Sequence, residues 1–171
     1  MTKIQFSEIQ AVPKIIKAKE LQIELPSAPI RYYRHGWQSW SLAAWTDPSP
    51  MPVQMPAIFH PLQVDAQHVH KKYLNGSWLG AIEFEDGNVL LLGALATDAN
   101  VSLVLNQLSG RSEADEIEWF LAFGQENICF KEYADQLGNR LAPRGELKKN
   151  DAPRVWCSWY SLYYSIDEAI L

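Results

Sequence analysis

The chain has 171 residues, of which 47% are hydrophobic and 20% are charged, so it can bury the core of a globular domain. Fifteen basic residues against twenty acidic ones give a net charge of -5 without a basic stripe, which excludes the electrostatic signature of a nucleic-acid binder. No apolar leader or run of eighteen apolar residues is present, so no membrane partner is predicted, and the two widely separated cysteines predict a cytoplasmic protein.

The first predicted strand is LQIEL at 21–25, because its apolar residues alternate with polar ones. The stretch RHGWQSWSLAAW at 34–45 then contains Trp37, Trp40 and Trp45. Residues three apart on a strand point to opposite faces, so one indole of Trp37 and Trp40 should pack and the other should face elsewhere. Core packing is the favoured interpretation of such aromatics. The alternative is a sugar site, in which an indole covers the flat C–H face of a pyranose and polar neighbours hold its hydroxyls.

The proline-rich run DPSPMPVQMP at 47–56 cannot pair within a sheet and predicts a long surface loop, of the kind that often carries binding residues. Beyond it, His68 and His70 would share a strand face, with His60 as a distant third candidate ligand. No cysteine or carboxylate completes this pattern at ligand spacing. A metal site is therefore the less favoured interpretation, and no metal or other cofactor is predicted.

The middle of the chain predicts a series of antiparallel strands. LGAIEF at 79–84 and VLLLGAL at 89–95 flank Asp86-Gly87, a pair that suits the tight turn of a hairpin. Two further apolar stretches, at 101–105 and 117–123, continue the series. The first 125 residues are therefore predicted to be mainly β.

The pattern changes in ENICFKEYADQLGNRL at 126–141, which predicts a helix. Phe130, Ala134, Leu137 and Leu141 recur at steps of four and three, so they are predicted to form its buried face.

The polar segment APRGELKKNDAP at 142–153 has a proline near each end and predicts a linker between domains. After it, RVWCSWYSLYY at 154–164 is strongly apolar, which is typical of a buried parallel strand. Ser165 and Glu168 then form a capping box that predicts a helix start, less than two turns before the sequence stops. The sequence thus predicts a second domain that is cut off as it begins.

Patterns of catalytic residues are sparse. Hydrolysis of a glycosidic bond needs two carboxylates that face it, but the acidic residues lie mostly in turns or in charged stretches such as SEADEIE at 112–118. Cys157 has no basic neighbour in sequence to activate it and is interpreted as a buried, inert thiol. Neither a glycine-rich phosphate loop nor a G-x-S-x-G motif occurs. No catalytic residue is therefore predicted.

Three stretches resemble one known family. HGWQSWS at 35–41, EYADQLGNRL at 132–141 and VWCSWYSLYYSIDEAIL at 155–171 resemble the N-terminal portion of the α-galactosidases of glycoside hydrolase family 36, which include melibiase and raffinose-synthase relatives. The segment between them, roughly 42–125, resembles the family only in being β-rich. An asparagine before the first motif and a proline-glycine pair before the last are more usual, so the subfamily and the exact substrate stay open.

The resemblance implies a mainly β fold: an N-terminal antiparallel β-sandwich followed by the first strand and the start of the first helix of a truncated (β/α)8 barrel. The sandwich, with a C-terminal helix and the linker, would span 1–150, and the truncated barrel would span 151–171. Family members are retaining exo-glycosidases whose nucleophile and acid/base aspartates lie on later barrel strands. The resemblance therefore implies that this chain alone carries no catalytic residue and is inactive.

The same resemblance assigns three substrate-binding residues. Trp40 corresponds to the indole that the sandwich extends into the galactose pocket, and Trp159 and Tyr160 correspond to aromatics at the C-terminal end of the first barrel strand. Trp37 and Trp156 would be packing partners. The implied partners are an α-galactoside oligosaccharide, such as melibiose or raffinose, and the remainder of the catalytic barrel.

Alternatives stay open at this point. One is a non-catalytic β-sandwich module that binds carbohydrate or protein, and a weaker one is a metal-dependent β-barrel that uses His68 and His70. Within the enzyme class, a galactosyl transferase or an N-acetylgalactosaminidase could share the scaffold. The sequence does not decide the linkage that is cleaved or whether the protein forms a homo-oligomer.

Overall fold

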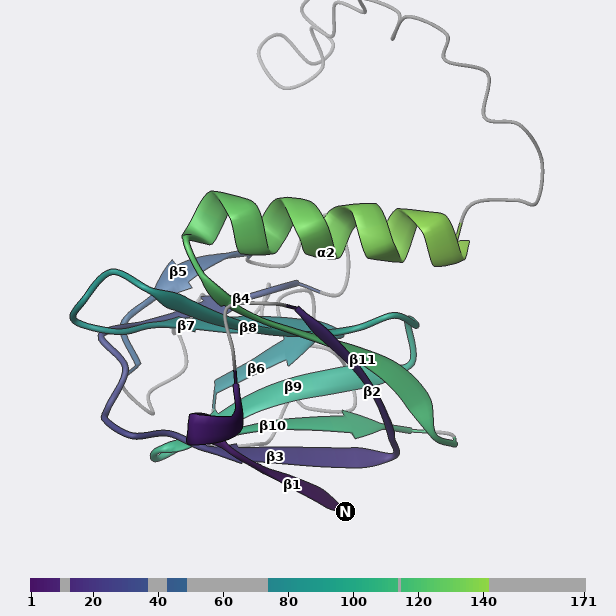
Figure 1. The fold of residues 1–171 in the computed structure, drawn as a ribbon, viewed down its shortest axis with the longest axis horizontal. Helices are drawn as coiled ribbons and strands as arrows, with labels where there is room; N and C mark the ends of the chain where they lie inside the picture. The colour runs from purple at the N-terminus through teal and green to yellow at the C-terminus, as the bar shows by residue number, and fades with distance from the viewer. Residues whose placement is uncertain (10–12, 37–42, 49–73, 114, 142–171) are drawn as a thin grey trace, which may run out of the picture.

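The computed structural model describes residues 1–9, 13–36, 43–48, 74–113 and 115–141 of the chain (Figure 1). In chain order, the elements of these residues are β1 (Thr2–Gln5), the 3-10 helix η1 (Phe6–Glu8), β2 (Lys14–Ala18), β3 (Glu20–Glu24), β4 (Arg31–Arg34), β5 (Ala44–Thr46), β6 (Leu74–Ser77), β7 (Leu79–Glu83), β8 (Val89–Ala94), β9 (Ala99–Val104), β10 (Gln107–Ser112), β11 (Ile117–Gly124) and the helix α2 (Glu126–Leu141).

The strands form two sheets that pack face to face. The six-stranded sheet has the order β2-β11-β8-β7-β4-β5, and the five-stranded sheet has the order β1-β3-β10-β9-β6. Helix α2 contacts β8 and β11 from the opposite side, so the six-stranded sheet is the middle of three layers (Figure 1). Among the described strands only β1 and β3 pair in parallel. The predicted mainly β, antiparallel sandwich is confirmed.

The middle sheet is apolar on both faces because both faces are covered. In β8, Leu90 and Leu92 belong to the core between the two sheets, whereas Val89 and Leu91 belong to the core beneath α2. All four side chains are completely buried. Successive residues of a strand point to opposite faces, so a strand such as β8, which is covered on both faces, has no position that suits a polar side chain. This arrangement explains the unbroken apolar run of β8.

The five-stranded sheet buries only one face against the other layers. Leu21, Ile23 and Leu25 of the predicted first strand are buried in the core between the sheets, as their alternation predicted. Across the same core, the hydroxyl of Tyr32 in β4 donates a hydrogen bond of 3.1 Å to the carbonyl of Val101 in β9. This bond connects the two sheets. It also supplies the acceptor that a buried tyrosine hydroxyl needs.

The hairpin of β7 and β8 is confirmed, together with its turn. The amide of Phe84 donates to the carbonyl of Asn88 over 3.0 Å, and Gly87 has a φ of +78°, the left-handed conformation for which glycine is favoured. The Asp86 carboxylate accepts a 3.0 Å hydrogen bond from the backbone amide of Asn88 and a 2.7 Å hydrogen bond from the side-chain amide of Asn88.

Helix α2 has the predicted bounds, but its buried face is rotated from the predicted one. Cys129 and Tyr133 are its buried residues, Phe130 and Leu137 are partly buried against the same cluster, Ala134 is exposed, and Leu141 is 55% exposed. The reason is the space above Gly93 of β8, which the ring of Tyr133 fills, while its hydroxyl donates a 2.8 Å hydrogen bond to the carbonyl of Ala94. The predicted face was therefore wrong at two of its four positions.

Several predictions fall outside the described residues. They concern most of the proline-rich run, the three histidines His60, His68 and His70, the linker, and the strand and capping box of the expected second domain. The proposed division into 1–150 and 151–171 therefore stays a prediction. Within the described part of the chain, no helix has both the length and the apolar character that crossing a membrane requires.

Candidate functional site

The three predicted substrate-binding residues, Trp40, Trp159 and Tyr160, lie outside the described residues. Both ends of the segment that carries Trp40 are described. β4 ends at Arg34 and β5 begins at Ala44, and these two residues are direct partners in an antiparallel pair. The tryptophan segment, which we define as residues 35–43, therefore joins two adjacent strands at one edge of the six-stranded sheet.

His35 anchors the first end of the tryptophan segment. Its carbonyl accepts a 2.9 Å hydrogen bond from the amide of Ser77 in β6, and its ring lies 4.9 Å from the ring of Trp78. The backbone of β6 approaches closely at this point, since a Cβ added to Gly76 would lie 3.1 Å from the His35 nitrogen and 2.1 Å from the Leu79 carbonyl oxygen. The tryptophan segment therefore starts at the end of β4 in the six-stranded sheet, and its first residue contacts β6, the edge strand of the five-stranded sheet.

Trp78 connects the two sheets at this corner as the single residue between β6 and β7. Its amide donates 2.8 Å to the carbonyl of Ala99, and its carbonyl accepts 2.7 Å from the amide of Ala94, so it is bonded to a strand of each sheet. Its φ of +44° is unusual for a bulky side chain and costs free energy that the surrounding contacts must offset. Trp78 packs against both apolar clusters, which supplies such contacts.

Polar side chains are buried around the same corner. Arg34 is only 9% exposed, and Asn75, Ser77 and Asn100 are also buried. The side-chain amide of Asn100 donates a 3.0 Å hydrogen bond to the carbonyl of Gly76. Removal from water lowers the pKa of the Arg34 guanidinium. A concentration of buried polar groups at one end of a β-sandwich is typical of a position with a specific structural or binding role.

His35 should make the stability of the chain depend on pH. Removal from water lowers the pKa of His35, and its Nδ1 has no hydrogen-bond partner among the described residues. The unfolded chain regains the ordinary histidine pKa of about 6.5, so the unfolded state binds this proton first as the pH falls. The free energy of unfolding should therefore decrease as the pH falls through that value, and level off below the lower pKa of the folded state.

The measurement is urea unfolding at pH 7.5 and pH 5.5 for the wild type and for His35→Gln. The wild type is expected to lose more stability between the two pH values than the variant does, because the other ionisable groups are common to both. Equal losses would contradict the assignment.

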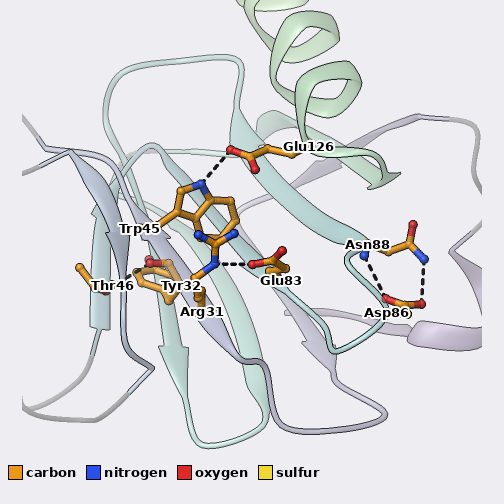
Figure 2. A network of polar contacts seen from close by, with 8 residues as sticks. All are labelled: Arg31, Tyr32, Trp45, Thr46, Glu83, Asp86, Asn88 and Glu126. Carbon is orange, nitrogen blue, oxygen red and sulfur yellow. Dashed lines mark hydrogen bonds and ion pairs between the residues drawn. The ribbon is translucent and has the colours of Figure 1, made fainter.

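Trp45 anchors the second end of the tryptophan segment (Figure 2). Its indole nitrogen donates a 2.8 Å hydrogen bond to a carboxylate oxygen of Glu126, the first residue of α2. The guanidinium carbon of Arg31 lies 5.0 Å from the centroid of the Trp45 ring, and the same guanidinium forms an ion pair with Glu83. The ring of Tyr33 packs edge-on against Trp45 at 5.6 Å. Trp45 is thus held by α2 and by β4 together.

The sequence marks Trp45 as one of three clustered tryptophans, but no sequence pattern singles out Arg31, Glu83 or Glu126. Arg31 and Glu83 face each other because their strands pair in the register Arg31↔Glu83, which only the folded sheet reveals. The sequence predicted Glu126 only as the first residue of a helix. Its contact with Trp45 joins residues 81 positions apart.

Other candidate sites are weaker. The described residues contain no group of three or more histidine, cysteine or acidic residues placed to hold a metal ion, and the three candidate histidines lie outside them. An open depression of about 240 Å³ is lined by Phe6, Phe84 and Phe123 with a few polar residues. Phe84 belongs to the core between the sheets, and Phe6 and Phe123 are partly buried against it. The three rings pack edge to face on one another, so the depression is the outer end of that core.

The chain is similar to two solved structures of an α-galactosidase. An α-galactosidase from Thermus thermophilus in complex with stachyose is 39% identical over 91% of this chain, with a TM-score of 0.71. The complex of an α-galactosidase from the same organism with p-nitrophenyl α-D-galactopyranoside is 38% identical over 95% of the chain, with a TM-score of 0.74. The resemblance to family 36 α-galactosidases is confirmed. Neither the protein-family models nor the curated proteins compared with the chain give a match.

The chain spans only part of the enzyme that it resembles. The chain covers 33% of the length of the Thermus thermophilus protein in both complexes. The similarity includes 91 to 95% of the present residues, so it is not limited to the three motifs. The sandwich and its helix α2 therefore resemble part of an α-galactosidase scaffold.

Proposed function

We propose that the chain is the N-terminal part of a retaining α-galactosidase that removes terminal α-galactosyl residues from oligosaccharides such as melibiose or raffinose. The observation that carries this proposal is the 38 to 39% identity, over nearly the whole chain, to an α-galactosidase whose structures contain stachyose and a nitrophenyl galactoside. Two-thirds of that enzyme has no counterpart in the present residues, so the activity is proposed for a polypeptide that contains this chain and the remainder of a catalytic barrel.

In this proposal the sandwich contributes to binding, and the barrel contributes the chemistry. The edge strand β5 and its neighbour β4 would present Trp40 to the galactose pocket, where an indole covers the apolar face of the sugar. Trp159 and Tyr160 would line the pocket from the end of the first barrel strand. Two barrel carboxylates would carry out double displacement, one as nucleophile and the other as acid and then base. A cytoplasmic location remains part of the proposal.

The test compares the 171-residue chain with a polypeptide that continues through the barrel, on a chromogenic α-galactoside. The short chain is expected to show no turnover above a blank, because most of the transition-state stabilisation comes from the missing carboxylates.

In the longer polypeptide, Trp40→Ala should lower kcat/KM by roughly 10- to 100-fold, since a lost aromatic contact is worth about 1.5–3 kcal/mol.

The matched control for Trp40 is Trp37, the packing partner in the same motif. Trp37→Ala should lower the melting temperature, whereas Trp40→Ala should leave it nearly unchanged. Turnover by the 171-residue chain would refute the assignment of catalysis to the barrel. A loss of stability in Trp40→Ala with unaltered kinetics would refute the assignment of Trp40 to the sugar.

A further inference from the structure

β5 is a strand that its own hydrogen bonds hold weakly. It has three residues, it lies at the edge of the six-stranded sheet, and β4 is its single strand neighbour. Edge strands of this length have few ladder hydrogen bonds and readily fray. The place where the chain re-enters the sheet after the tryptophan segment therefore depends on side-chain contacts.

Trp45, the central residue of β5, makes these contacts on its helix side. Its N–H group donates to Glu126 at the start of α2, and its ring lies 6.2 Å from that of Phe130, one turn further along the helix. A hydrogen bond to a carboxylate is stronger than one between neutral groups. Since α2 is itself fixed on the sheet by Tyr133 and Cys129, this bond connects β5 to a rigid element.

On its sheet side, Trp45 is held by β4. Arg31 lies over the indole face, and the ion pair with Glu83 of β7 keeps the guanidinium in that place (Figure 2). A guanidinium over an indole is attracted by the negative face of the ring. Tyr33 completes the enclosure, because its ring packs edge-on against both Trp45 and Phe130. Helix α2 and strand β4 therefore both contact this indole of β5, and β7 acts on it indirectly through the ion pair of Glu83 with Arg31.

We propose that Trp45, Glu126, Arg31 and Glu83 form a clasp that positions β5, so that these residues act as positioning residues for the galactoside site of the proposed function. The clasp fixes the position, relative to α2, of β5, the strand that follows the tryptophan segment. Its members do not contact the sugar themselves. The inference rests on the proposed function only for its kinetic consequence, and the position of β5 can be tested without it.

The first test measures amide hydrogen exchange in the 171-residue chain. Trp45→Phe keeps an aromatic ring but removes the N–H donor, and Glu126→Ala removes the acceptor. Each is expected to speed exchange across β5 about 3- to 10-fold, the effect of losing one solvent-exposed hydrogen bond, while β8 and β11 keep their protection. Glu126→Gln retains an acceptor oxygen and is expected to lie between the wild type and Glu126→Ala.

The double variant Trp45→Phe, Glu126→Ala tests whether the two residues act as a unit. Its β5 exchange should be within about twofold of either single variant, because both substitutions break the same bond. The control is Lys131→Ala, which removes an exposed ion pair with Asp135 on the same helix and should leave β5 unchanged. Unchanged β5 exchange in the single variants, or multiplied effects in the double variant, would overturn the clasp.

The second test uses the longer polypeptide and a chromogenic α-galactoside. Trp45→Phe and Glu126→Ala are expected to raise KM several-fold with a smaller effect on kcat, and Glu126→Gln should partly restore KM. Faster β5 exchange with unaltered KM would overturn the positioning role. A wild-type polypeptide without galactoside turnover would overturn the proposed function instead, and the exchange experiment would then decide on the clasp alone.

Discussion

Gly93→Ala is expected to destabilise the chain by about 3 kcal/mol or more, because a methyl group at this position has no room. A Cβ built on Gly93 would lie 2.2 Å from one ring carbon of Tyr133 and 2.6 Å from another. Tyr133 cannot move aside without losing its hydrogen bond to the carbonyl of Ala94, and it is only 4% exposed. The substitution should therefore lift α2 from the middle sheet.

Thermal unfolding measures this effect, with an expected fall in Tm of roughly 10 °C for a chain of this size. Gly138→Ala is the matched control. It adds the same methyl group in α2 at a site with nothing within 4 Å, and it should stabilise the helix by up to about 1 kcal/mol. If the clash is the cause, Gly93→Ala should cost much less when Tyr133 is already alanine. Equal costs in both backgrounds would contradict this explanation.

Trp119→Ala is expected to cost about 3–5 kcal/mol, a large part of the stability of an ordinary domain. Trp119 of β11 is completely buried between the two sheets, and its indole nitrogen donates a 3.0 Å hydrogen bond to the carbonyl of Ala18. Its ring fills the space above Gly110 of β10, where a Cβ would lie 2.7 Å from two ring carbons. Removing the ring leaves a cavity in the centre of the sandwich.

Urea unfolding of three variants separates the contributions at this site. Trp119→Phe keeps part of the packing and removes the N–H donor, so its loss should lie between that of the wild type and that of Trp119→Ala. Gly110→Ala should also destabilise the chain, because it forces the ring away from the opposite side. A Trp119→Ala variant within about 1 kcal/mol of the wild type would show that the core collapses onto the site.

Strands of both sheets could be predicted from the sequence for a simple physical reason. Apolar alternation identified Leu21 and Ile23, and the pair Asp86-Gly87 identified the tight hairpin, because both signals are local. The buried face of α2 could not be predicted in this way. It depends on the space above Gly93 and on the carbonyl of Ala94, which belong to a distant strand. Periodicity alone therefore favoured Ala134 and Leu141, which are exposed.

The candidate site was predictable only in part. The tryptophan motif and its resemblance to family 36 enzymes pointed to the connection between β4 and β5, and this assignment stays a prediction. Comparison with solved structures supports the α-galactosidase-like fold of the chain as a whole. The anchors of that connection were not predictable. Trp78 of the first anchor and Glu126 of the second come from segments far along the chain, and strand register and helix placement bring them to the motif.

The single-residue passage at Trp78 has a consequence for how the length of this chain can vary. Because side chains alternate along a strand, one inserted or deleted residue beside Trp78 would turn either β6 or β7 inside out and break bonds to both sheets. The turn at Gly87 has open space around it and tolerates extra residues far better. An added residue is therefore expected to be tolerated in a turn of the latter kind and to destabilise the chain at the corner beside the tryptophan segment.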